Sequence, residues 1–229
     1  MRIGAIVAAA GLGTRLGRGS KALVQLNGRT TLARAVSLFL GLDEVTAIVV
    51  VGPPGRLDLV RAELAGLEPR KPAAVCAGGE SRQMSVRAGL QALGDCDYVL
   101  VHDAARPLAT AALTRRVLQA AMESGAAFPG LPPRDAVKRV EGNRLVESLD
   151  RSRIVLAQTP QAFSYQVLLK AHFEAFDAGV AGDDDAQLVA ATGHLVTVVQ
   201  GEPTNIKLTT TEDLEVLEAL LREHEGQPA

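Results

Sequence analysis

Short, continuous apolar runs recur along the chain, and they are separated by stretches with a different periodicity. Runs of four to eight apolar residues rich in Val and Ile are typical of buried β-strands. They predict strands over Ile3–Ala9, Ala47–Val51, Ala73–Cys76, Tyr98–Val101 and Leu195–Val199.

The intervening stretches repeat apolar residues every three or four positions, as amphipathic helices do. They predict helices over Thr31–Leu40, Leu57–Leu64, Ser81–Leu93, Ala111–Ser124, Tyr165–Ala178, Asp184–Thr192 and Thr211–Glu223. Apolar strands alternating with helices indicate an α/β fold with a largely parallel sheet covered on both faces.

One segment departs from this alternation. Pro132–Asp150 contains two polar–apolar alternating runs around Glu141-Gly142-Asn143, a pattern that predicts a β-hairpin. Its many charges indicate that the hairpin projects from the sheet. Two interpretations remain open at this point: a solvated excursion, or an arm that reaches a neighbouring subunit and carries functional residues.

Length and composition narrow the class. The 229 residues are 47% hydrophobic and 22% charged, which is typical of a globular protein. Without repeats or linkers, one domain over residues 1–229 with an arm at 132–152 is expected. The net charge of −2 argues against general nucleic-acid binding. Cys76 and Cys96 give no metal spacing and are interpreted as buried thiols in a reducing compartment.

The N-terminus, MRIGAIVAAA, superficially resembles a short signal peptide. Two observations argue against a signal peptide: its positive region would be a single residue, and the glycine-rich pattern that follows is better explained as a binding loop. No apolar run reaches the roughly 18 residues of a membrane span. A cytoplasmic protein without a membrane partner is therefore expected.

A glycine-rich loop follows the first strand. Gly11, Gly13 and Gly17 allow a close backbone approach to an anion, and Arg15 and Lys21 can pair with phosphate oxygens. The dinucleotide fingerprint fails because residue 16 is Leu, and the Walker pattern is absent. A tight turn with solvated basic residues remains an alternative.

The sequence YVLVHDAARP places Asp103 and Arg106 at the carboxyl end of a strand, where open α/β sheets bind ligands. Asp103 suits Mg²⁺, which takes few carboxylates and keeps water and phosphate ligands. Asp103 could also cap the helix over Ala111–Ser124. His102 is interpreted as a structural residue.

Two further clusters are less specific. In AGGESRQMSV, Gly79 precedes a helix start where Ser81 fits the N-cap position. Arg151, Thr159 and Lys207 are dispersed, and their spacing alone indicates no function.

Taken in order, AAGLGTR, SK, GGESR, VHDAARP, the hairpin ends, QTPQAF and NIKLT resemble the 2-C-methyl-D-erythritol 4-phosphate cytidylyltransferases of the non-mevalonate isoprenoid pathway. The resemblance implies a Rossmann-like fold of the nucleotide-diphospho-sugar transferase type. It also implies transfer of CMP from CTP to methylerythritol phosphate with Mg²⁺, releasing pyrophosphate. A homodimer with interlocking arms is a further implication.

Carried over to this chain, the resemblance gives each motif a role. The positions matching the triphosphate and catalytic residues are Arg15, Lys21, Arg151 and Lys207. Those matching nucleotide or acceptor binding are Ala9, Ala10, Gly11, Gly13, Gly79, Glu80, Ser85, Ala104, Arg106, Asp135 and Thr159. Asp103 matches the metal-associated position.

The chain departs from the family pattern at Ser20, where a Pro is usual, at Ala136, where a Thr is usual, and at Asp183. These departures concern hydrogen bonds on the acceptor side more than the phosphate chemistry.

Two rivals stay open: a ribitol 5-phosphate cytidylyltransferase, and a non-catalytic nucleotide-binding protein of the same fold. The broken fingerprint at Leu16 argues against a dinucleotide-dependent oxidoreductase.

Overall fold

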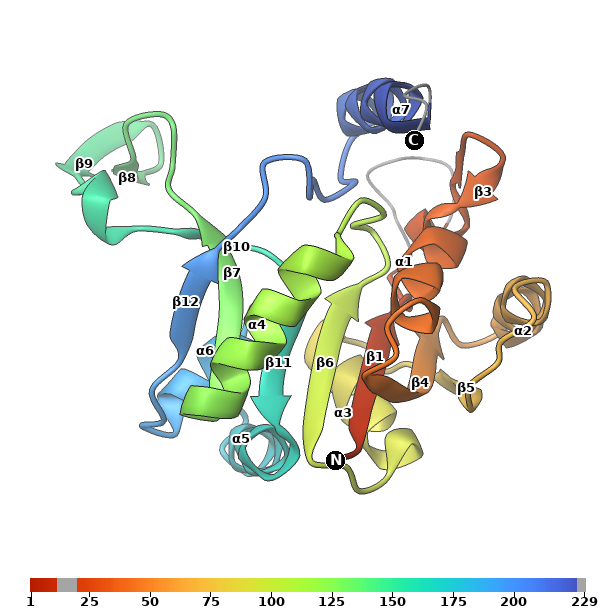
Figure 1. Ribbon diagram of the computed structural model, residues 1–229. Coiled ribbons are helices and arrows are strands. Elements are labelled where there is room, and N and C mark those ends of the chain that lie inside the picture. The colour runs from red at the N-terminus through yellow and green to blue at the C-terminus, as the bar shows by residue number, and fades with distance from the viewer. Residues whose placement is uncertain (12–19, 226–229) are drawn as a thin grey trace.

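The computed structural model describes residues 1–11 and 20–225. Its centre is an eight-stranded, mostly parallel sheet in the order β10-β7-β11-β6-β1-β4-β5, with β12 on the free edge of β7 (Figure 1). The strands are β1 (Ile3–Ala8), β4 (Val45–Gly52), β5 (Ala73–Ala77), β6 (Tyr98–Asp103), β7 (Ala126–Leu131), β10 (Leu156–Ala157), β11 (Gln161–Ser164) and β12 (Thr197–Gln200).

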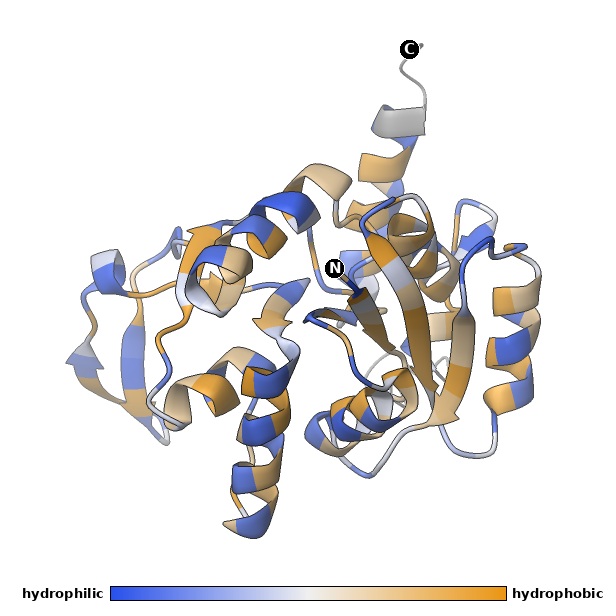
Figure 2. Ribbon diagram, turned by 60° about the horizontal axis from the view of Figure 1, so that its bottom comes forward, coloured by the Kyte–Doolittle hydropathy of each residue, from blue (hydrophilic) through white to orange (hydrophobic). Residues whose placement is uncertain are grey.

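Helices cover both faces of this sheet, as the alternating pattern predicts. The helices are α1 (Thr31–Leu40), α2 (Leu57–Ala65), α3 (Arg82–Leu93), α4 (Ala111–Ser124), α5 (Tyr165–Asp177) and α6 (Asp185–Ala191). Apolar residues of α1, α2 and α4 form one core cluster with the sheet, and those of α3, α5 and α6 form the other. Strand β1 serves both, because Ala5 and Val7 face the first cluster and Ile6 the second. Apolar positions accordingly follow the central strands in Figure 2.

A smaller layer lies above the carboxyl ends of the strands. Helix α7 (Thr211–Glu225) packs Leu214, Leu217 and Leu221 against Val24, Leu26 and Leu208. The short strands β2 (Gln25–Leu26) and β3 (Arg29–Thr30) and the turn η2 (Lys21–Leu23) belong to this region. The layer therefore holds the segments that carry Lys21 and Lys207. Within the described residues, no helix combines the length and the apolar character that a membrane span requires.

The predicted hairpin is present and projects from the sheet. Strands β8 (Lys138–Glu141) and β9 (Arg144–Ser148) pair only with each other, and Gly142 in their turn has a φ of +60°. That left-handed backbone is one that glycine adopts without steric cost. Every side chain of β8 and β9 is exposed.

The burial predicted for two strands is wrong. Residues 73–76 lie in β5, which is partly exposed, and the strand predicted at Leu195–Val199 is found at Thr197–Gln200, with Leu195 85% exposed. Both strands lie at edges of the sheet, where helices cover less of each strand. The two cysteines are likewise only half-buried, and burial raises the pKa of Cys96 to about 11.

The sequence pattern did not predict β7 and β11. Strand β7 reads AAFPGL and β11 reads QAFS, so neither has the run of β-branched residues that marks β1 or β4. Strand β11 nevertheless pairs antiparallel with both β6 and β7. Pairing with neighbours, and not local propensity, makes these segments strands.

Candidate active site

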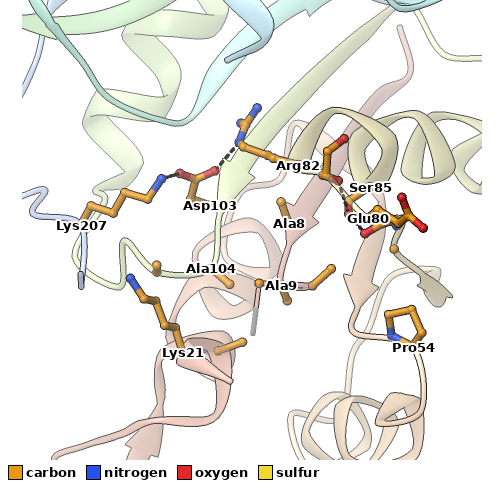
Figure 3. Close-up of a pocket in the computed structure, with 17 residues that line it drawn as sticks. Ala8, Ala9, Lys21, Pro54, Glu80, Arg82, Ser85, Asp103, Ala104 and Lys207 are labelled. Atoms are coloured by element: carbon orange, nitrogen blue, oxygen red, sulfur yellow. Dashed lines mark hydrogen bonds and ion pairs between the residues drawn. The ribbon is translucent and has the colours of Figure 1, made fainter. Parts of the chain in front are cut away.

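A cavity of about 710 Å³ opens at the carboxyl ends of β1 and β6, next to the start of α3 (Figure 3). This is where doubly wound sheets place their ligands. It is lined by Ala8, Ala9, Ala10, Gly11, Lys21, Ala22, Pro54, Gly78, Gly79, Glu80, Ser81, Arg82, Ser85, Asp103, Ala104, Ala105 and Lys207.

Close packing between β5 and α3 forms one side of the cavity. A Cβ atom on Gly78 would lie 2.4 Å from the Ala10 Cβ, and one on Gly79 would lie 2.5 Å from the Met84 Cβ, so only glycine fits at both positions. The Ser85 hydroxyl accepts from the Gly79 N–H at 3.2 Å and donates to the Ser81 carbonyl at 2.9 Å. Ser85 therefore fixes the shape of the loop at residues 78–81.

Ser81 is the N-cap of α3, because its side chain accepts a hydrogen bond from the Met84 N–H at 3.1 Å. This confirms the capping role predicted for it. The cap places the loop at residues 78–81 directly before the helix N-terminus, where backbone N–H groups favour polar or anionic ligands.

Asp103, at the end of β6, holds two cations. Its Oδ1 lies 2.9 Å from Arg82 Nε, and its Oδ2 lies 2.6 Å from Lys207 Nζ (Figure 3). Burial by itself would raise the pKa of Asp103, but Arg82 and Lys207 together hold it well below its usual value. The Asp103 carboxylate is thus ionised at neutral pH and fixes the Lys207 ammonium at the cavity wall.

Lys21 lies at the start of η2, and its Nζ donates to the Thr209 carbonyl at 3.4 Å. In Figure 3, Lys21 and Lys207 lie on one side of the cavity, whereas Glu80 and Pro54 lie on the other. The two lysines therefore lie at one end of the cavity, and the loop at residues 78–81 lies at the other.

His102 is linked to Asp103 through the Thr159 hydroxyl. The His102 ring is fully buried, its Nδ1 lies 2.9 Å from the Thr159 hydroxyl and its Nε2 lies 3.1 Å from the Arg106 carbonyl. The Thr159 oxygen also accepts from the Asp103 N–H at 3.1 Å. Burial lowers the pKa of His102 to about 4, so a neutral ring with structural contacts agrees with the sequence interpretation.

The alternative that Asp103 caps α4 is wrong. The N-cap of α4 is Thr110, whose side chain accepts from the Leu113 N–H at 3.0 Å. Asp103 is instead the last residue of β6, seven positions before that cap.

Most of the predicted site residues meet at the cavity. Those that line it are Ala9, Ala10, Gly11, Lys21, Gly79, Glu80, Ser85, Asp103, Ala104 and Lys207. Gly13 and Arg15 lie outside the described residues.

Four predicted residues lie elsewhere. Arg106 does not line the cavity, and its guanidinium donates to the carbonyls of Asn205 at 2.7 Å and Ala157 at 3.2 Å. Thr159 contacts the backbone N–H of Asp103 and does not line the cavity. Asp135 and Arg151 are exposed at the base of the arm, and neither contributes to the cavity of its own chain.

Arg82 is a site residue that the sequence did not single out. Besides Asp103, it contacts Asp185 of α6 through Nη1 at 2.7 Å. The available signal was its place in GGESR, directly after the Ser81 cap. Its partner at position 185 is over 100 residues away, however, and no local pattern links the two.

A doubly wound α/β sheet whose strand ends form a cavity lined by two lysines and by Gly78 and Gly79 is typical of nucleotide-binding proteins. The model of one family, IspD, 2-C-methyl-D-erythritol 4-phosphate cytidylyltransferase, matches residues 3–223. The chain belongs to this family.

Individual relatives agree. The chain is 40% identical over 222 residues to the 2-C-methyl-D-erythritol 4-phosphate cytidylyltransferase of Geobacillus kaustophilus, covering 96% of this chain and 97% of the relative. It is 46% identical over 224 residues to the bifunctional enzyme IspD/IspF of Anaeromyxobacter dehalogenans, covering 96% of this chain but only 57% of that protein. The chain thus spans little more than half of its bifunctional relatives.

A solved structure shares the fold. The crystal structure of 2-C-methyl-D-erythritol 4-phosphate cytidylyltransferase from Thermus thermophilus superposes with a TM-score of 0.80 at 38% identity. The match covers 97% of this chain and all of that one.

Proposed function

We propose that this protein transfers CMP from CTP to 2-C-methyl-D-erythritol 4-phosphate, giving 4-diphosphocytidyl-2-C-methyl-D-erythritol and pyrophosphate. The observation that carries the proposal is the polarity of the cavity. Lys21 and Lys207 lie at one end, where a triphosphate needs cations. The loop at residues 78–81 lies at the other end, where its backbone groups can bind a pyrimidine.

The reaction suits the side chains present. The attacking group is a phosphate oxygen of the acceptor, which is anionic near neutral pH, so no general base is required. This agrees with the buried, neutral His102. Lys21 stabilises the charge that develops around the α-phosphorus, and Lys207, held by Asp103, positions the reacting phosphate groups.

Mg²⁺ is the expected cofactor, and the donor set fits it. No group of three or more His, Cys, Asp or Glu side chains converges on one point among residues 1–11 and 20–225. Asp103 and Glu80 are carboxylates of the cavity wall, and Mg²⁺ usually takes one or two carboxylates together with substrate phosphates and water. Both Asp103 oxygens pair with cations in this structure, so Asp103 would hold the ion in exchange for one of these two contacts. When bound, the ion would neutralise charge on the phosphate chain.

We also propose a homodimer formed through the arm. The arm exposes three apolar side chains, Val140, Leu145 and Val146, which are 57%, 63% and 42% exposed. An isolated hairpin is only marginally stable, and exposed apolar side chains of this kind mark a contact surface. Because Asp135 and Arg151 lie apart from the cavity of their own chain, an arm crossing to a partner would bring them to the partner's site.

The function is tested by measuring pyrophosphate release with CTP, UTP, ATP or GTP, each combined with methylerythritol phosphate or ribitol 5-phosphate. We expect release only with CTP and methylerythritol phosphate, and none when the acceptor is omitted. Comparable release with ATP or GTP would contradict the cytidine specificity. Preference for ribitol 5-phosphate would favour the sibling enzyme, and no release from any pair would favour a non-catalytic nucleotide-binding protein.

A further inference from the structure

Three consecutive aspartates at the start of α6 have different surroundings. Asp183 is exposed. Asp184 is the N-cap, accepting from the Gln187 N–H at 2.8 Å, and its other oxygen accepts from Gln161 Nε2 at 2.8 Å. Asp185 is fully buried and points into the protein interior. Because Asp184 already caps the helix, the Asp185 carboxylate has another role.

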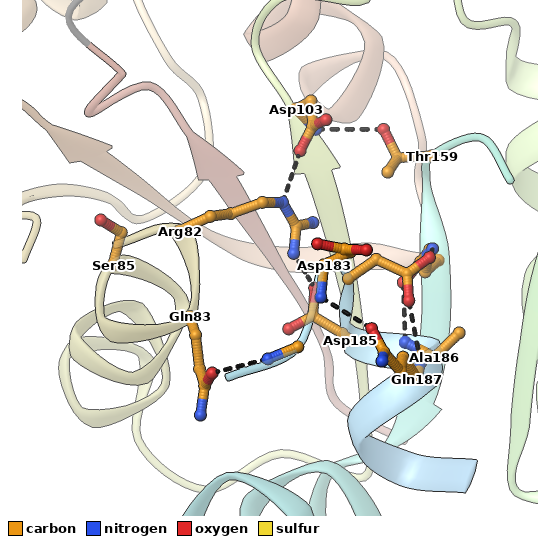
Figure 4. Close-up of polar contacts among 12 residues, drawn as sticks. Arg82, Gln83, Ser85, Asp103, Thr159, Asp183, Asp185, Ala186 and Gln187 are labelled. Carbon is orange, nitrogen blue, oxygen red and sulfur yellow. Dashed lines mark hydrogen bonds and ion pairs between the residues drawn. The ribbon is translucent and has the colours of Figure 1, made fainter. Parts of the chain in front are cut away.

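Asp185 contacts two residues from two other helices. Its Oδ2 lies 2.7 Å from Arg82 Nη1 of α3 (Figure 4). Its Oδ1 lies 2.9 Å from His172 Nε2 of α5. Burial would raise the pKa of Asp185, but Arg82 and His172 lower it below its usual value. Asp185 does not line the cavity. Asp185 is therefore an ionised carboxylate that reaches the cavity only through Arg82.

Arg82 connects Asp185 to the cavity. One guanidinium places Nη1 on Asp185 and Nε on Asp103, so two carboxylates share its charge (Figure 4). On its other oxygen, Asp103 holds Lys207. The result is a row of alternating charges that runs from the buried interface of α5 and α6 to the cavity wall.

Of the two cations that Asp103 holds, Lys207 is held less firmly than Arg82. The Lys207 side chain is 42% exposed on a flexible stem, whereas the Arg82 side chain is 23% exposed and planar. If Asp185 lost its charge, Asp103 alone would have to compensate the charge of Arg82. Asp103 would then attract Arg82 more strongly, and its contact with Lys207 would weaken. The position of Lys207 therefore depends on a carboxylate that it does not touch.

We propose that Asp185 is a positioning residue: it neutralises Arg82 so that Asp103 remains available to fix Lys207 at the cavity, and His172 in turn orients Asp185. This proposal rests on the proposed CMP transfer only for the tests that measure kcat, and not for the contacts themselves. The residues that carry it lie on α3, α5, α6 and β6, which the fold brings together at one end of the sheet.

The first test is Asp185→Asn, with Asp177→Asn as the matched control. Asp177 is an exposed aspartate at the end of α5, away from the cavity. Outer residues that orient groups at a site typically contribute about 10–100-fold to activity. We expect Asp185→Asn to lower kcat at least about tenfold, with the KM for CTP changed by less than about threefold. Unchanged kcat would overturn the proposal.

A second measurement separates positioning from a general loss of structure. Asp185→Asn is combined with Lys207→Met and assayed under single-turnover conditions. If Asp185 acts through Lys207, the double variant is about as active as Lys207→Met alone, because the losses are not additive. If Asp185 only supports the fold, its substitution lowers the rate by the same factor in both backgrounds, which would overturn the proposal.

Milder variants keep the test valid should Asp185→Asn fail to fold. His172→Gln retains a side-chain donor that can reach Asp185, and His172→Leu of similar size does not. We expect His172→Gln to restore most of the kcat that His172→Leu loses. Equal kcat values for the two variants, or no loss in either, would contradict the role of His172.

A readout without turnover distinguishes failure of this proposal from failure of the proposed function. Lys207 is labelled with acetic anhydride, and its rate is compared with that of Lys170 in the same molecule by mass spectrometry. We expect Asp185→Asn to raise the relative rate at Lys207 at least about threefold, because its ion pair is loosened, and Asp177→Asn to leave it unchanged. An unchanged rate at Lys207 in Asp185→Asn would overturn the proposal even if pyrophosphate release behaves as expected.

Discussion

The cavity and the arm each contain an arginine–carboxylate pair of nearly the same length, but the two pairs have different surroundings. Arg82 and Asp103 lie 2.9 Å apart with side chains 23% and 10% exposed, whereas Arg139 and Glu147 lie 3.1 Å apart with side chains 55% and 51% exposed. Water screens the second pair, so it contributes little. The first has lost most of its hydration, so each charge depends on its partner.

Apolar side chains show the reverse contrast. Around the cavity, the sheet and helices bury Ile6, Val7 and Val101 completely. On the arm, Val140 and Leu145 remain exposed. The cavity region thus completes its own core, whereas the arm has apolar surface that only another surface can cover.

The largest expected effect is the loss of the buried pair. Asp103→Asn removes the carboxylate of Lys207 and one of the two that pair with Arg82. Breaking a buried ion pair costs about 3–5 kcal/mol of unfolding free energy, and we expect the lower end of this range because Asp185 still compensates Arg82. Urea unfolding at pH 7 measures the loss. Glu147→Gln on the arm is the control, with an expected change below about 1 kcal/mol. Similar losses in the two variants would contradict the contrast between the regions.

The same variant predicts a pH dependence. Because the pKa of Asp103 is lower in the folded protein than in the unfolded chain, where it is about 3.9, its pairing stabilises the fold fully above about pH 5. The stabilisation is lost as the pH falls further. We expect the unfolding free energy of the wild type to drop more steeply between pH 7 and pH 3.5 than that of Asp103→Asn. Parallel pH profiles would contradict this assignment.

The next effect concerns catalysis. Lys21→Ala removes a cation from the end of the cavity that we propose binds the triphosphate, and we expect turnover at saturating CTP to fall at least about a hundredfold, equivalent to about 2.7 kcal/mol. Steady-state pyrophosphate release measures it. Lys170→Ala, on the exposed face of α5, is the control and should retain wild-type turnover. A tenfold effect or less for Lys21→Ala would contradict a direct role in the transition state.

The smallest expected effect is on assembly. Leu145→Asp places a charge on the apolar surface of the arm, and we expect at least about tenfold weaker dimerisation, equivalent to about 1.4 kcal/mol. Sedimentation velocity measures it. Leu59→Asp alters an exposed leucine of α2, 52% exposed, and should leave the dimer intact. A wild type that sediments as a fully active monomer would contradict both the dimer and the shared site.

The fold could be predicted where local pattern and burial agree. The runs at β1, β4 and β6 and the periodic stretches at α1 and α4 are found within two residues of their predicted bounds. The pattern was insufficient at β7, whose Ala, Pro and Gly have low strand propensity. It also misjudged burial at β5, because a sequence does not show which strand becomes the edge of a sheet.

Within the site, the residues that carry a local sequence signal could be predicted. Asp103 after a strand, Lys21 after a glycine-rich loop and Gly79 before a helix all lie at the cavity, because the carboxyl ends of parallel strands meet at one edge of the sheet.

Three features of the site depend on contacts between distant segments: the burial of Asp185 among the three aspartates at 183–185, the link from Asp185 through Arg82 to Asp103, and the contact of Arg106 with the Asn205 carbonyl. These contacts connect segments from about 20 to more than 100 residues apart. A charged side chain is buried only where another part of the fold supplies its partner, and no local sequence pattern encodes that partner.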